Sequence, residues 1–150
     1  YCWDKDLLRT YKETRNGLLG ADYSSKLSAW LSIGCISPRT IYQEVKRYEA
    51  ERVKNDSTYW LIFELLWRDY FRFAAKKYGN KIFQLKGLRG KEIENENNAE
   101  HFEKWRLGET GVPFIDANMK ELLVSGFMSN RGRQNVASFL TKDLKVNWTW

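Results

Sequence analysis

The chain has 150 residues, enough for one domain with a sizeable core, and its formal net charge of +6 suits a polyanionic partner without specifying one. Its 7 Trp, 8 Tyr and 8 Phe exceed what such a core needs and suggest stacking surfaces for rings or bases. Cys2 and Cys35 form no disulfide framework and have no metal-ligand spacing to His101, so we expect no metal and an intracellular location, whether cytoplasm, nucleus or organelle. No apolar stretch approaches the roughly 18 residues of a membrane span, so no membrane partner is expected.

Apolar residues recur with helical spacing in the first half of the chain, and local signals indicate where the helices begin and end. Asp22 or Ser24 is expected to cap a helix that stops at Gly34. Ser37 followed by Pro38 is typical of a helix start. The helices expected here span 24–34, 38–52 and 57–79, the last being the longest and ending at Gly79.

The second half begins with a segment in which the helical pattern fails. Residues 91–103 carry one Lys and five Glu, so 87–98 is expected to be mostly a solvated loop. Helices are then expected over 98–108, 113–126 and 130–144. The fold class is therefore all-α and multi-helical, and both chain ends are interpreted as cuts through a longer protein.

The segment from Asp22 to Ser28 places three serine hydroxyls and Lys26 at an expected helix start. Unpaired backbone N–H groups and the positive end of the helix dipole would make this start a phosphate cradle. Simple helix capping explains the same residues, and spacing alone favours capping.

The helix from Ser57 carries a carboxylate on an aromatic face. Trp60, Glu64, Trp67 and Phe71 follow at i, i+4, i+7 and i+11, and Arg68 lies four residues after Glu64. A carboxylate beside large rings is partly desolvated unless it is paired, and Arg68 is a candidate partner. An ordinary intrahelical salt bridge on a helix packed through its aromatics explains the pattern equally well.

A third pattern is the run Asn130-Arg131-Gly132-Arg133-Gln134. On a helix, Asn130, Arg133 and Gln134 share a face, which can bind the edge of a planar heterocycle and balance an anion. A solvated helix start is the alternative, although arginines at an N-terminus oppose the helix dipole. Trp105 and Trp148 indicate no chemistry by spacing and are expected to be core tryptophans.

Four segments, in this order, resemble the flavin domain of the photolyase/cryptochrome family. Gln134 and the stretch 11–20 resemble the cryptochrome-DASH branch most, and the resemblance covers almost the whole chain. The four segments are Ser24 to Ser28, Glu64 to Phe71, Thr110 to Ala117, and Gly126 to Arg133 with its continuation to Leu144.

The resemblance implies a U-shaped FAD in a helical pocket. It leaves the antenna pigment of a full-length protein open, with a folate as one option. In family terms the diphosphate of FAD is held by Ser24, Ser25 and Ser28, in agreement with the phosphate cradle described above. The other residues that the resemblance places at the cofactor are Tyr11, Arg68, Asn130 and Arg133. Leu61 stands where cyclobutane-dimer photolyases carry a cofactor-lining Trp.

The resemblance also implies a DNA site in which a flipped-out pyrimidine dimer meets the flavin. The catalytic residues would be Glu64, which hydrogen-bonds the dimer, Trp67, which stacks on it, and Asn130. Gln134 would line the dimer pocket, and Arg15 and Arg131 would hold DNA phosphates. Trp105 and Trp148 match the outer and middle members of the tryptophan relay that photoreduces the flavin.

The function implied is light-dependent repair of cyclobutane pyrimidine dimers, preferentially in single-stranded DNA, by electron transfer from reduced FAD. The alternative is a blue-light receptor that binds FAD and nucleic acid without repair, and a flavin-free helical nucleic-acid binder is a third possibility. We expect a monomer. We also expect residues 1–150 to be a partial FAD-binding domain that lacks the family's N-terminal α/β antenna domain.

Overall fold

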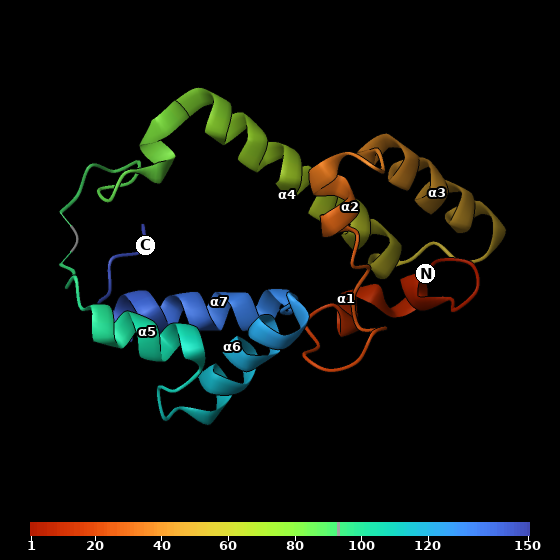
Figure 1. The fold of residues 1–150 in the computed structure, drawn as a ribbon. Helices are drawn as coiled ribbons and strands as arrows, with labels where there is room; N and C mark the ends of the chain where they lie inside the picture. The colour runs from red at the N-terminus through yellow and green to blue at the C-terminus, as the bar shows by residue number, and fades with distance from the viewer. Residues whose placement is uncertain (93) are drawn as a thin grey trace. The chain divides into compact units, whose positions relative to one another are not determined.

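The computed structural model describes residues 1–92 and 94–150 and divides into two compact units, Tyr1–Ala74 and Ala75–Trp150 (Figure 1). The boundary falls within the longest helix. The described residues form helices, and their one β contact is an isolated bridge between Glu96 and Val146. The all-α prediction is therefore confirmed, and no described helix is both long and apolar enough to span a membrane.

The first unit is built on two helices with well-defined starts. Ser37 caps α3 by accepting a hydrogen bond from the Arg39 N–H at 3.2 Å, and Pro38 occupies the first helical position. The helices are the 3₁₀ turn η1 (Leu7–Thr10), α1 (Tyr11–Thr14), α2 (Ser28–Ile33), α3 (Pro38–Glu51) and α4 (Asp56–Tyr78). Their buried core consists of Leu8, Tyr11, Ile41, Val45, Tyr48, Leu61 and Leu65.

Two sequence expectations in this unit were wrong. The helix expected from Ser24 begins only at Ser28, and the residue before it, Leu27, makes no side-chain cap bond. Lys26 has a left-handed backbone with φ of 55°, which interrupts a right-handed helix at this point. Capping by Asp22 or Ser24 therefore fails, and Ser24 and Ser25 precede the helix instead of lying at its start, where the phosphate cradle was expected. The elements η1 and α1 were missed because their short turns have no periodicity to detect.

Among its described residues, the second unit contains three α-helices joined by short turns. The Asn98 side chain caps α5 (Ala99–Leu107), α6 (Pro113–Ser125) begins at a proline, and α7 (Asn130–Ser138) continues as the π-helical turn η3 (Phe139–Asp143). A 3₁₀ turn, η2 (Gly79–Phe83), precedes them. The core of this unit is Ile115, Met119, Met128 and Val136.

Helices α6 and α7 approach closely at a glycine. A Cβ added at Gly132 would lie 2.2 Å from Asn118 Oδ1, and Asn118 is itself held by donating its Nδ2 hydrogen to the Phe114 carbonyl at 2.8 Å. Gly132 is therefore needed for packing, in addition to being part of the run that carries the predicted site residues.

Candidate functional site

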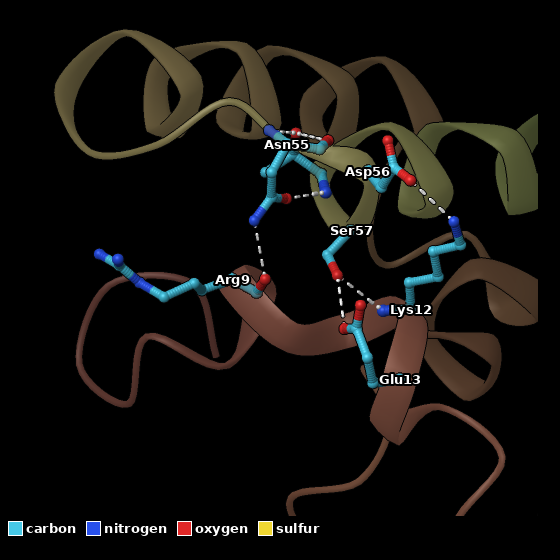
Figure 2. Close-up of polar contacts among 7 residues, drawn as sticks. Arg9, Lys12, Glu13, Asn55, Asp56 and Ser57 are labelled. Atoms are coloured by element: carbon cyan, nitrogen blue, oxygen red, sulfur yellow. Dashed lines mark hydrogen bonds and ion pairs between the residues drawn. The ribbon is translucent and has the colours of Figure 1, made fainter.

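A polar junction fixes α1 against the start of α4 (Figure 2). The hydroxyl of Ser57, 2% exposed, accepts a hydrogen bond from the Lys12 backbone N–H at 3.0 Å and donates one to Glu13 Oε2 at 2.9 Å. Asn55 adds a bond from its side-chain amide to the Arg9 carbonyl at 2.9 Å. The junction holds α1 so that Tyr11 and the residue after the helix, Arg15, are fixed relative to α4. Sequence reasoning missed it, because Ser57 was interpreted only as a helix start.

Arg15 and Glu64, which the sequence assigned to separate roles, are in direct contact. Arg15 Nη1 donates to Glu64 Oε1 at 2.7 Å, and the two side chains are 23% and 34% exposed. The guanidinium carbon of Arg15 also lies 5.3 Å from the centre of the Trp60 ring, with the Lys12 ammonium 5.0 Å from it. A positive charge is attracted to the face of an aromatic ring, so both contacts are favourable. The partner of Glu64 is thus Arg15, and the expected pairing with Arg68 is not what the structure shows.

Arg68 retains hydrogen-bonding capacity. Its Nη2 lies 3.4 Å from the Leu31 carbonyl oxygen of α2, and its Nη1 is 3.6 Å from the Asp69 carboxylate. That Nη1 is buried and has no hydrogen-bond partner among the described residues. A buried donor without a partner is costly, so a site with an unused guanidinium N–H suits an anionic ligand.

The hydroxyl-bearing segment belongs to the same unit and leads into α2. Ser24 and Ser25 are half-buried, and Ser28 opens α2, the helix whose Leu31 carbonyl contacts Arg68. Burial raises the pKa of the Tyr11 hydroxyl, the Glu64 charge raises it further, and a hydrogen bond with Ser25 opposes the rise. Hydroxyls and a guanidinium N–H are donors of the kind that a phosphate-bearing cofactor such as FAD requires.

The ring of Trp67 is accessible and supported by neighbouring aromatics. It is 42% exposed, lies 5.6 Å from Phe71 with an interplanar angle of 27°, and meets Phe63 and Tyr70 edge-on. Leu61 is 3% exposed and belongs to the core of the unit. An exposed ring of this kind offers a stacking surface.

In the second unit, the predicted residues of the third pattern lie on the first turns of α7. Ser129, 1% exposed, caps this helix by accepting from the Gly132 N–H at 2.9 Å. Arg131 Nη1 donates to Gln134 Oε1 at 2.9 Å, and Arg133 Nε donates to the Met128 carbonyl at 3.2 Å. The residues that remain exposed are Asn130, Arg131, Arg133 and Gln134. The capping role of Ser129 was missed, although a serine directly before a predicted helix is a usable signal.

The two tryptophans of the expected relay have different surroundings. Trp105 is half-buried, and its indole N–H donates to the Val136 carbonyl at 2.9 Å, as expected for a core tryptophan. Trp148 is 39% exposed and donates to the Leu85 carbonyl at 3.2 Å, so it is not a core residue. Phe102 contacts Trp105 at 5.8 Å and Trp150 at 5.6 Å between ring centres, which connects Trp105 with Trp150.

Comparison with known proteins gives one consistent result. The chain is 65% identical over 150 residues to Cryptochrome DASH of Synechocystis sp. (strain ATCC 27184 / PCC 6803 / Kazusa), covering 100% of this chain and 31% of that protein. It is 62% identical over 148 residues to Cryptochrome DASH of Danio rerio, covering 99% of this chain and 28% of that protein. The chain thus spans about a third of the length of these relatives.

Solved structures agree. The crystal structure of the Synechocystis sp. PCC6803 cryptochrome matches with a TM-score of 0.98 and 65% identity, over 100% of this chain and 31% of that one. A class III photolyase from Agrobacterium tumefaciens matches with a TM-score of 0.75 and 26% identity, over 95% of this chain and 30% of that one. Residues 60–150 match the family model described as the FAD binding domain of DNA photolyase. The predictions of family, helical fold and FAD as cofactor are confirmed, and the chain belongs to the FAD-binding domain family of DNA photolyases.

Proposed function

We propose that this chain is part of the catalytic region of a light-dependent enzyme that cleaves cyclobutane pyrimidine dimers, with a preference for single-stranded DNA. The observation that carries the proposal is on α4. This helix presents Glu64, with one carboxylate oxygen held by Arg15, and the accessible ring of Trp67 three residues later. A carboxylate and a stacking surface this close on one helix suit a ligand that is both planar and rich in hydrogen-bond donors.

In this proposal the chain's own residues bind and orient the two ligands. The cofactor would be held by Tyr11, Ser24, Ser25, Ser28, Arg68, Asn130 and Arg133. The dimer would be stacked on Trp67 and hydrogen-bonded by Glu64, with Asn130 and Gln134 lining its pocket and Arg15 and Arg131 contacting phosphate. Bound, reduced FAD would supply, under blue light, one electron that returns to it after the two carbon–carbon bonds joining the pyrimidines have broken.

The substrate preference follows from the cost of extrusion. A base inside a duplex has to be unpaired and unstacked before Trp67 can stack on it, and this cost is smallest for a damaged or single-stranded site. Stacking on an aromatic ring returns about 1–3 kcal/mol per base. Arginine contacts to phosphate add affinity that falls with salt concentration. We also propose that residues 1–150 are a partial FAD-binding domain within a longer protein, since the matched relatives are about three times as long.

The decisive experiment uses the full-length protein that carries this chain. The protein with reduced FAD is illuminated in the presence of a single-stranded oligonucleotide that contains one thymine dimer, and the recovery of intact thymines is measured. We expect repair by the unchanged protein and a much lower, still measurable repair rate in Glu64→Gln. Trp67→Ala is expected to weaken oligonucleotide binding about 5- to 150-fold, the equivalent of about 1–3 kcal/mol.

The matched control is Phe73→Ala, which removes another exposed aromatic from α4, 70% exposed, that has no role in the proposal. Equal effects at Phe73 and Trp67 would contradict the stacking assignment. Intact dimers after illumination, in a protein that retains FAD, would exclude repair and favour the receptor alternative.

A further inference from the structure

We propose that Arg15 is a positioning residue for Glu64, and that it acts on the dimer through this carboxylate in addition to any contact with DNA phosphate. The inference rests on the proposed function, because it assigns Arg15 a part in the same reaction. The two residues are 49 positions apart in the sequence and are bonded at 2.7 Å.

Arg15 is itself held in place at three points. Its backbone N–H closes α1 by donating to the Tyr11 carbonyl at 2.9 Å, and α1 is fixed to α4 through Ser57. Its guanidinium lies over the Trp60 ring at 5.3 Å. At 23% exposure the side chain is mostly shielded from water, so its bond to a carboxylate is charge-assisted and weakly screened.

Glu64 has few other restraints. Its Oε1 accepts the Arg15 bond, so Oε2 is the oxygen that this pair does not use. Arg68, the cation one helical turn away, contacts the Leu31 carbonyl through its Nη2, and its Nη1 faces Asp69 at 3.6 Å. Without Arg15, a side chain with three rotatable bonds would sample several positions. With Arg15 in place, one oxygen is fixed and the other is available to the substrate.

The positioning role and a simple phosphate contact predict different kinetics. A phosphate contact contributes to affinity, so its loss weakens DNA binding and lowers the salt dependence, while the rate at saturating DNA is unchanged. A positioning contact determines whether Glu64 reaches the dimer, so its loss lowers the rate at saturating DNA. Residues that act as one unit also have non-additive effects.

The test compares Arg15→Gln, Arg15→Lys, Glu64→Gln and the double variant in the full-length protein, by repair rate at saturating dimer oligonucleotide and by oligonucleotide affinity as a function of salt. Lys12→Gln is the matched control: it removes one positive charge from α1 and from the same Trp60 ring, but Lys12 is paired with Asp56 at 2.8 Å. We expect Arg15→Gln to lower the saturating rate about 10- to 100-fold. The double variant should be no slower than Glu64→Gln, Arg15→Lys should recover part of the rate, and Lys12→Gln should keep it.

The outcomes separate the two proposals. If the unchanged protein repairs dimers and Arg15→Gln alters only affinity and salt dependence, Arg15 is a phosphate contact and the positioning role is wrong. The same conclusion follows if the single effects of Arg15→Gln and Glu64→Gln multiply in the double variant. If the unchanged protein repairs nothing, the proposed function fails, and the positioning role fails with it.

Discussion

Ser57→Ala tests whether the junction between α1 and α4 holds the first unit together. The substitution removes an acceptor that satisfies the Lys12 N–H at 3.0 Å and a donor to Glu13 at 2.9 Å. Leaving a buried N–H without a partner costs about 1–3 kcal/mol. In the variant, the exposed Glu13 carboxylate can accept a hydrogen bond from water instead, so the loss of its bond to Ser57 costs at most about 1 kcal/mol. The expected loss in the free energy of unfolding is therefore about 1–4 kcal/mol.

The measurement is urea unfolding followed by circular dichroism, with hydrogen exchange of the Lys12 amide as the local readout. Ser32→Ala is the control, because Ser32 is exposed and its hydroxyl donates within its own helix, to the Ala29 carbonyl at 2.7 Å. Substitutions at such sites usually change stability by less than about 0.5 kcal/mol. A loss at Ser57 no larger than that at Ser32, with unchanged protection of the Lys12 amide, would refute the reasoning.

Three further predictions concern other contacts. Gly132→Ala should destabilise the protein by about 1–3 kcal/mol because its Cβ would overlap Asn118 Oδ1, and unfolding experiments should show the loss relieved when Asn118→Ala is added. Asp116→Ala should cost about 1–2 kcal/mol in urea unfolding, because the carboxylate accepts from the Thr110 N–H and hydroxyl at 2.8 and 2.6 Å; an unchanged midpoint would contradict this. Hydrogen bonds from Tyr48 and Arg52 lower the pKa of Asp6 from 3.8 to about 2. The stability that this contributes is present above pH 3.8 and is lost as the pH falls through about 2, so Asp6→Asn should flatten that part of the stability profile in acid titrations.

The helices that sequence reasoning placed well are those with local signals at both ends. Ser37 with Pro38 predicted the start of α3, and the helix expected over 98–108 agrees with α5, which Asn98 caps and which ends at Gly108. Capping depends on side chains within a few residues of the backbone they satisfy, so the sequence contains the whole interaction. The start of α2 was misplaced because serine occurs in loops as well as at helix starts, so the serines before α2 did not locate its first residue.

How well the site residues could be predicted depended on how far apart in the sequence their contact partners lie. Glu64 and Trp67 were found on one helix by spacing alone, since periodicity fixes the face that each residue occupies. The partner of Glu64 was not found, because Arg15 lies 49 residues away and the nearer Arg68 offered a plausible local pair. Burial of Ser57 was equally hidden, since a serine at a helix start is usually exposed.

The junction at Ser57 also has a consequence for the order in which the chain folds. It joins residues 45 apart, whereas α5, α6 and α7 are connected to one another by short turns. Compared with closing a loop of about five residues, closing one of about 45 costs about 2 kcal/mol more in chain entropy. Contacts between near neighbours form sooner than those that require long loops. The helical hairpins of the second unit should therefore form early. Helix α1 should dock onto α4 among the last steps, after α3 has formed and brought the two ends of the loop between Lys12 and Ser57 together.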